Sequence, residues 1–289
     1  MGALELAITA VHSRGLDWPR LAGERSTGHW QTVLGDSWLA GWLAEVPPTH
    51  LYLGSELCEE LVPSRRNLRA GVDRARTDGL RIALLTPVSG PQTIERLAEL
   101  LPLLPDGAEI IVNDWGVAMF ARQNHPTLVL VAGRLLCRMI RDPRLPSREW
   151  ARHCAHGLDS QYLQRALRLA GISRLEMDVP PFPTPETFAR LPLPTGVHLP
   201  YAVVAKGRMC RIGSMSRQGP ERFAPGRKCR KECLRLSATM SRSESTSDRH
   251  TVQFGNTILS QHSHDMSEVI VAAVAAGHIT RLIAPGDLL

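Results

Sequence analysis

Short runs of aliphatic and β-branched residues recur along this chain and alternate with stretches of helical periodicity. The run Leu80–Thr86 (LRIALLT) is typical, because it is too short for most helices and apolar on both faces, as in a buried parallel strand. Similar runs predict strands at Leu4–Thr9, His50–Leu53, Glu109–Asn113, Thr127–Ala132, Arg174–Val179, Val197–Val204 and Ile279–Ala284, and a paired Thr251–Phe254 and Thr257–Gln261.

Helical periodicity is clearest in Gln31–Val46, where Leu34, Trp38 and Trp42 follow one another at a spacing of four and Pro47 ends the pattern. Comparable patterns predict further helices at Ser64–Asp78, Gln92–Leu101, Ser160–Ala170 and Ser267–Ala276.

The alternation of buried-type strands with helices indicates an α/β fold built on a parallel sheet. About eight such units over 289 residues predict one (β/α)8 TIM-type barrel domain spanning 1–289, with irregularities. An open doubly wound sheet is the alternative. The sequence has no GxGxxG after its first strand and no GxxxxGK[ST], which argues against nucleotide-binding folds.

The composition is that of a soluble globular protein, with 43% hydrophobic and 21% charged residues. No apolar run reaches the roughly 18 to 20 residues that cross a bilayer, and the N-terminus is a poor signal peptide. We therefore expect a cytoplasmic protein without a transmembrane segment. Six cysteines are too few for a disulfide framework in a chain of this length, so clustered cysteines point to metal binding.

One segment, Ala202–Arg235, concentrates both charge and cysteine. It opens a basic, cysteine-rich loop at 205–250 after the seventh predicted strand. From Lys206 to Arg235 it has ten Lys or Arg against Glu221 and Glu232, a local charge of +8 in a chain whose total is +6, so the remainder sums to −2. Positive neighbours favour thiolates, which are the form that binds metals. Its cysteines are Cys210, Cys229 and Cys233.

A fourth cysteine, Cys58, follows the second predicted strand, and Cys210 follows the seventh. In a parallel barrel both would open onto the same face. Cys229 and Cys233 would present their sulfurs on one side if the segment between them were helical. Four thiolates satisfy either Zn²⁺ or an iron–sulfur cluster, and spacing alone does not choose between them. The CxxC pairs common in zinc sites are absent, and the basic segment complements an anionic [4Fe–4S] cluster.

Three phrases carry a resemblance to a known family: YLGSELC with Cys58, AVVAKGRMC with Cys210 and RKCRKEC with Cys229 and Cys233. Together with VNDWG at 112–116 and GRLLCRMIRDPR at 133–144, they resemble the collagenase-like peptidase family U32, over roughly residues 49–260. In layout the chain is most similar to the branch that takes part in oxygen-independent ubiquinone biosynthesis.

The resemblance implies a barrel-like fold and a [4Fe–4S] cluster on Cys58, Cys210, Cys229 and Cys233. It also implies oxygen-independent hydroxylation, of a quinone precursor or of RNA, and a heterodimer with a related partner subunit. The family's peptidase label finds no support in the residues, because the sequence has no HExxH and no assignable Ser/His/Asp or Cys/His arrangement.

Two pairs of polar residues are weaker candidates for a substrate site. Asn113 and Asp114 end the fourth predicted strand, where they would either face a pocket or form a turn and helix N-cap. Glu176 and Asp178 stand two apart on the sixth strand and so point to one face. At a barrel mouth they would bind substrate or act as acid and base; otherwise they would pair with barrel arginines.

Four arginines lie in the irregular basic segment after the fifth strand, and they are interpreted as a solvated basic face rather than an anion site: Arg134, Arg138, Arg141 and Arg144.

The cysteine pattern together with the resemblance thus favours an iron–sulfur protein that takes part in oxygen-independent hydroxylation. An RNA-modifying or RNA-binding protein, a peptidase and a zinc-stapled scaffold stand as alternatives.

Overall fold

The structure is a computed structural model of the chain. It describes residues 3–11, 26–137, 139, 141–153, 157–158, 160–207, 209–223, 229–240 and 251–286.

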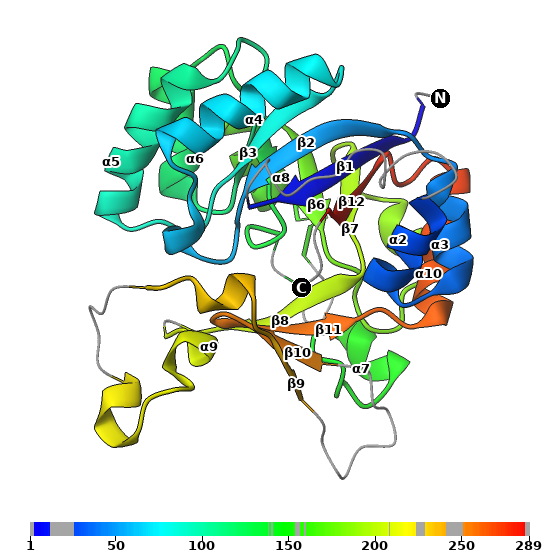
Figure 1. Cartoon of the computed structure of the whole chain (residues 1–289). Helices are drawn as coiled ribbons and strands as arrows, with labels where there is room; N and C mark the ends of the chain where they lie inside the picture. Colours follow the sequence, from blue (N-terminus) through cyan, green and yellow to red (C-terminus); the bar gives the residue numbers. More distant parts are fainter. Residues whose placement is uncertain are drawn as a thin grey trace.

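Eight parallel strands close into a barrel, as the sequence predicts (Figure 1). Each strand pairs with its neighbours in chain order, and the last strand closes the ring by pairing with both the first and the seventh. The barrel strands are β1 (Glu5–Ala10), β2 (Pro48–Gly54), β3 (Arg81–Leu85), β4 (Glu109–Val112), β5 (Val129–Ala132), β6 (Ile172–Met177), β7 (Thr195–His198) and β12 (Arg281–Pro285).

Helices connect the strands on the outside of the barrel, which is the arrangement of a (β/α)8 TIM barrel (Figure 1). They are α2 (Ser26–Leu34), α3 (Ser37–Ala44), α4 (Arg65–Thr77), α5 (Pro91–Leu100), α6 (Trp115–Asn124), α7 (Arg148–His153), α8 (Gln161–Leu169) and α10 (His264–Ala275). Short 3₁₀ turns are η2 (Glu59–Leu61), η3 (Leu101–Leu103) and η4 (Pro185–Phe188).

Alternation along each strand separates two apolar layers. On β1, Leu6 and Ile8 pack outward in the large core between strands and helices, while Ala7 points into the barrel. Within the barrel the middle layer is Ala7, Tyr52, Ala83, Leu85, Ile111, Val131 and Ile283. Because these residues leave little space, the barrel centre is a packed core, and room for a ligand exists only toward its ends.

The helical pattern of Gln31–Val46 is two helices rather than one. Gly35 adopts a left-handed φ of 68° after α2, and Asp36 then caps α3 by accepting hydrogen bonds from the amides of Trp38 and Leu39. A glycine tolerates this conformation and an aspartate is a good N-cap, so the two together break the helix despite its continuous apolar stripe.

A second sheet follows the seventh barrel strand, and it corrects the predicted strand Val197–Val204. That run breaks at Leu199 and Pro200, so its first part is β7 of the barrel and its second part is β8 (Tyr201–Lys206). Strand β8 pairs with β11 (Thr257–Gln261), which pairs with β10 (Thr251–Phe254) and then β9 (Ala238–Met240), all antiparallel. The β10–β11 hairpin is the pair that the sequence predicts.

The cysteine-rich loop therefore begins after β8, within this second sheet, rather than directly after a barrel strand. Its described part contains α9 (Arg211–Ser214), η5 (Gly219–Phe223) and η6 (Glu232–Leu234). Residues 208, 224–228 and 241–250 of the predicted loop lie outside the described residues.

An apolar cluster joins the second sheet to the barrel mouth, where the sheet lies beneath the barrel in Figure 1. Leu57 and Leu61 come from the segment after β2, and Val203, Phe254 and Leu259 come from the second sheet. The structure thus has a barrel with a small antiparallel sheet packed against it. In the described part of the chain, no helix has the length and apolar character needed to cross a membrane.

Candidate iron–sulfur site at the barrel mouth

The four predicted cysteine ligands line one small cavity of about 10 Å³. Cys58 immediately follows the β2 region and precedes η2, and Cys210 precedes α9. Cys229 and Cys233 come from the later part of the same loop, and Cys233 is 5% exposed. Two regions that are far apart in the sequence, the segment after β2 and the cysteine-rich loop, thus bring their thiols to one cavity.

The segment between Cys229 and Cys233 is not the helix that the spacing of four suggests. Lys231 adopts a left-handed φ of 59°, and only Glu232–Leu234 forms a 3₁₀ turn. A turn brings both thiols to the cavity in place of a helical face.

The cysteines of the group act electrostatically on one another, and all three others act on Cys233. Burial, followed by Cys210, Cys58 and Cys229, raises the pKa of Cys233 to about 12. Burial is also the largest cause that raises the pKa of Cys58 and of Cys210, and neighbouring cysteines add to it in both. Four thiolates at this point therefore need a compensating cation, which is what a bound metal centre supplies.

Backbone amides already point at two of the sulfurs. The Gly213 amide donates to Cys210 Sγ at 3.2 Å, and the Lys231 amide donates to Cys229 Sγ at 3.3 Å. Hydrogen bonds of this kind favour the thiolate and tune the potential of iron–sulfur sites.

Four thiolates are a donor set that both Zn²⁺ and a [4Fe–4S] cluster accept. In a zinc site all four sulfurs bind one ion at about 2.3 Å, whereas in a [4Fe–4S] cluster each thiolate binds a different iron. Among the described residues, no group of three or more His, Cys, Asp or Glu side chains is placed to hold one metal ion.

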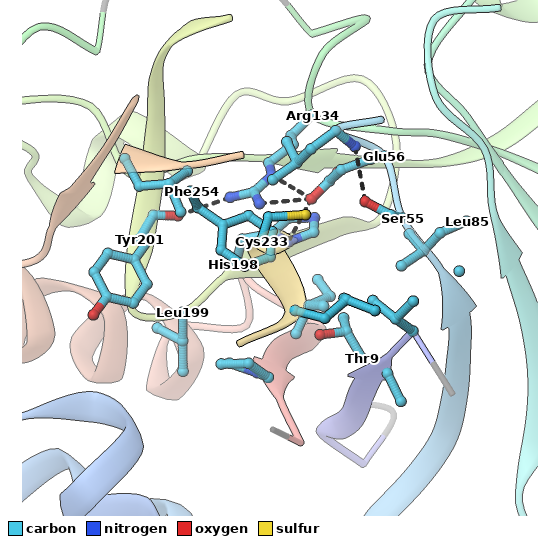
Figure 2. Close-up of a pocket in the computed structure, with 18 of the residues that line it drawn as sticks. Thr9, Ser55, Glu56, Leu85, Arg134, His198, Leu199, Tyr201, Cys233 and Phe254 are labelled. Atoms are coloured by element: carbon cyan, nitrogen blue, oxygen red, sulfur yellow. Dashed lines mark hydrogen bonds and ion pairs between the residues drawn. The ribbon is translucent and has the colours of Figure 1, made fainter. Parts of the chain in front are cut away.

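A second cavity, of about 710 Å³, lies at the barrel mouth beside the cysteines (Figure 2). The ends of several barrel strands contribute to its wall, for example Thr9 of β1, Leu85 of β3 and His198 of β7. Three residues line both this cavity and the small one: Leu57, Cys233 and Phe254. A metal centre on the cysteines would therefore share a wall with the larger cavity.

Arg134 organises the polar side of this mouth cavity. Its Nε and Nη2 lie 2.8 and 2.6 Å from Glu56 Oε1, and its Nη1 donates to Asp178 Oδ1 at 2.8 Å. Arg141 pairs with the second oxygen of Asp178 at 2.6 Å. Burial raises the pKa of Asp178, but Arg134 and Arg141 outweigh it, so the pKa lies below its ordinary value.

These contacts correct the interpretation of the arginine segment as a solvated face. Arg134 is buried, with 7% exposed, Arg141 is partly buried, and both form ion pairs with Asp178. Arg144 is exposed and pairs with Asp142, as a surface residue would. Arg138 lies outside the described residues.

Glu176 and Asp178 do point to one face, the barrel interior, and both are fully buried. Tyr52 donates its hydroxyl to Glu176 Oε1 at 2.7 Å, and His198 Nε2 lies 2.9 Å from Glu176 Oε2. Because a carboxylate only accepts, this contact places the imidazole proton on Nε2. Glu176 and Asp178 are not among the residues that line the cavity; they hold His198 and Arg134, which are.

Asn113 and Asp114 are also not among the residues that line the mouth cavity. Asn113 is buried and bridges two loops, donating to Thr86 O at 2.9 Å and accepting from the Leu135 amide at 2.9 Å. Asp114 is the N-cap of α6 and accepts from the amides of Gly116 and Val117. Of the two interpretations that the sequence left open for Asp114, the structure has the turn and N-cap.

Sequence reasoning missed Glu56 and His198 as site residues and misassigned Arg134. Each stands at or just after the C-terminal end of a barrel strand, namely β2, β7 and β5. That position is the signal that would have found them, since functional residues of parallel barrels collect there.

Comparisons with known proteins give fold-level similarities. No protein-family model matches the chain, and no curated protein matches it by sequence. The structure of the U32 peptidase Mk0906 matches with a TM-score of 0.44 and 11% identity, covering 99% of this chain and 94% of that chain. A C-terminal domain assigned to a chitinase of Desulfitobacterium hafniense matches with a TM-score of 0.41 and 10% identity, covering 99% and 93%. The choice of function therefore rests on the site.

Proposed function

We propose that this chain is an iron–sulfur protein in which Cys58, Cys210, Cys229 and Cys233 hold a [4Fe–4S] cluster beside a substrate cavity. The observation that supports it is the shared wall. The four cysteines line one cavity, and Cys233 belongs also to the lining of the barrel mouth. A reaction at the mouth would take place next to the centre that the cysteines bind.

A bound [4Fe–4S] cluster supplies one-electron transfer at a potential set by charge, hydrogen bonding and exposure. The chain's own groups would prepare that environment. The amides of Gly213 and Lys231 stabilise thiolate sulfur, and Leu57, Leu61 and Phe254 exclude water from the cysteine cavity. Lys206 adds a nearby positive charge that acts on Cys58.

The reaction we propose is oxygen-independent hydroxylation of a small molecule of the ubiquinone-precursor type, in which water would supply the hydroxyl oxygen, two protons would leave to solvent and two electrons would leave to an external electron acceptor. The mouth cavity has the volume of a small-molecule site, about 710 Å³. His198 lies in its wall, and Glu176 fixes the orientation of the imidazole, so His198 can exchange a proton with a bound molecule through Nδ1. A homologous partner subunit completes the proposal, and the mass of the anaerobically purified complex tests it.

The test is anaerobic purification with a visible spectrum and analysis of iron, inorganic sulfide and zinc. Wild-type protein is expected to be brown, with iron and sulfide in equal amounts. Cys229→Ala is expected to lose the colour and the iron, because one of four ligands is gone.

Cys137→Ala is the matched control, since Cys137 is a buried free thiol of the main core and lines neither cavity. It should keep the full iron content. A colourless wild type that holds zinc, or equal iron in Cys229→Ala and wild type, would overturn the proposal.

RNA is the second candidate substrate, and the charge of the cysteine loop supports it. Between Lys206 and Arg235, four described arginines are exposed: Arg211, Arg222, Arg230 and Arg235. Phosphate binding by these residues predicts an affinity for tRNA that falls steeply between low and moderate salt. Affinity that is unchanged by salt, or by Arg211→Ala with Arg230→Ala, would remove this candidate.

A further inference from the structure

Glu56 is a buried carboxylate with one oxygen left over. It follows β2, is 5% exposed and lines the mouth cavity. Its Oε1 takes both contacts with Arg134, whereas its Oε2 is buried and has no hydrogen-bond partner among the described residues. Buried carboxylate oxygens nearly always have a donor, because leaving one unpaired is costly. The wall of the cavity thus contains an acceptor that nothing in the described protein satisfies.

The neighbouring cation, Arg134, is already paired with protein groups and is therefore not a site for an anionic ligand. Every guanidinium nitrogen of Arg134 already has a protein partner, since Nη1 contacts both Asp178 and the Tyr201 carbonyl, the latter at 2.7 Å. Both guanidiniums at this wall are paired with carboxylates, Arg134 with Glu56 and Asp178 and Arg141 with Asp178, and Glu176 contacts the imidazole of His198. A ligand carboxylate or phosphate would meet acceptors at this wall, and a hydrogen-bond donor would meet Glu56 Oε2.

The rest of the wall is mainly apolar, and Figure 2 shows Glu56, Arg134 and His198 together with Cys233 and Phe254 next to them. Its polar side chains besides those three are Thr9, Ser55, Asn67 and Tyr201. Its apolar side chains are Ala10, Val11, Leu57, Leu85, Leu199, Leu234, Phe254, Leu259, Ile283 and Pro285.

We propose that the mouth cavity binds a neutral, largely apolar molecule that carries a hydroxyl group, and that this hydroxyl donates to Glu56 Oε2. The volume accommodates a molecule of two fused rings with substituents. The inference rests on the proposed function only in taking this ligand as the molecule acted on beside the cysteines. Binding itself can be measured with or without a cluster.

Three probes with one apolar body separate the chemistry: 2-naphthol, 2-methoxynaphthalene and 2-naphthoate. Equilibrium dialysis against the purified full chain at neutral pH gives each affinity. We expect 2-naphthol to bind about ten times more tightly than 2-methoxynaphthalene, since one hydrogen bond to a charged acceptor is lost in the ether. We expect 2-naphthoate to bind most weakly.

Glu56→Gln should remove most of the advantage of 2-naphthol over the ether, and Glu60→Gln should leave it unchanged. Glu60 is an exposed carboxylate four residues away that does not line the cavity. If Glu56→Gln fails to fold, the three probes on the wild-type chain still decide. Equal affinity for the naphthol and the ether, or tightest binding of the naphthoate, overturns the inference.

The same dialysis on Cys229→Ala separates this inference from the cluster proposal. The preference for 2-naphthol is expected to persist there, because Glu56 does not depend on Cys229. Absence of iron in the wild type would contradict the cluster proposal but not the binding inference. Absence of the preference for 2-naphthol would contradict the binding inference but not the cluster proposal.

Discussion

The barrel interior has an arginine cluster at each end. In the closed cluster, around Arg281, every buried polar atom has a partner among the described residues, whereas in the open cluster, around Arg134, one carboxylate oxygen has none. At the N-terminal end of the strands, Arg281 is 1% exposed and contacts Glu5 and Glu109, the Tyr52 hydroxyl at 2.5 Å and His50 Nε2 at 2.9 Å. Among the described residues, none of these groups has a buried polar atom without a partner. At the mouth, Arg134 holds Glu56 and Asp178 in a similar way, but Glu56 lines a cavity and its Oε2 has no partner among the described residues.

The two clusters differ in whether all of their polar groups have partners, and we interpret this difference as one between a structural role and a binding role. Both clusters are built from the same residue types, and Tyr52 connects them, because it contacts Arg281 on one side and Glu176 on the other. In the closed cluster every buried polar atom of the described residues has a hydrogen-bond or ion-pair partner, so we interpret it as stabilising the fold. The open cluster has an unsatisfied acceptor beside the cysteine cavity, which is the pattern of a binding site.

The largest effect should come from breaking the closed cluster. Arg281→Met removes the buried cation of two partly buried carboxylates, Glu5 and Glu109, and is expected to lower the free energy of unfolding by about 3–5 kcal/mol. Urea denaturation measures it. Arg144→Met, which removes an exposed arginine, serves as the control and should leave the free energy of unfolding close to that of the wild type. A loss below about 1 kcal/mol for Arg281→Met would contradict the structural role.

An intermediate effect should come from acid. Burial, then Arg281, lowers the pKa of His50 from 6.5 to about 3, and the contact of Arg281 Nη2 with His50 Nε2 requires a neutral ring. Below pH 6.5 the unfolded chain binds a proton that the folded chain does not, so this contribution to stability is complete above pH 6.5 and is lost as the pH falls toward 3. The expected slope is up to about 1.4 kcal/mol per pH unit from this group.

Urea titrations at several pH values between 6.5 and 4 test this, with His50→Gln reducing the slope. His264→Gln is the comparison, because His264 is exposed and its bond to Asp36 raises its pKa instead. An unchanged slope in His50→Gln would refute the assignment.

The smallest effect should come from Asp114, which the sequence offered as a substrate residue. As the N-cap of α6, Asp114→Ala should cost about 1 kcal/mol of unfolding free energy. The affinity for 2-naphthol should not change, since Asp114 does not line the cavity. Asp114→Asn retains a capping oxygen and should recover most of the stability. A loss of probe affinity in both variants would return Asp114 to the binding site.

The barrel could be predicted because its strands repeat a local signal. The alternation that places Ala7 inward also places Glu176 and Asp178 on one face, and the structure has them there. The convergence of Cys58 with the late cysteines could be anticipated for the same reason, since parallel strands all end at one rim. The division of β7 from β8 and of α2 from α3 was missed, because Pro200 and Gly35 each interrupt an apolar run that continues beyond them.

The open cluster could not be predicted from local pattern. Arg134 lies in a basic stretch and resembles a surface residue, but its partners Glu56 and Asp178 are 78 and 44 residues away in the sequence. Helix α6 was missed as well, although its N-cap Asp114 was named, because its sequence WGVAMFARQN has only a weak amphipathic pattern. Burial of a charge is a tertiary property, and only closure of the barrel makes it visible.

The cluster proposal is tested by Mössbauer spectroscopy of anaerobically purified protein from cells grown on isotopically enriched iron. The spectrum shows whether the four cysteines at the shared wall hold one cluster. The result we predict is a single population of [4Fe–4S] iron, with about four iron atoms per chain, which is absent from Cys233→Ser and present in Cys137→Ala. Iron that is mononuclear or absent in the wild type, or a cluster that survives in Cys233→Ser, would contradict the account.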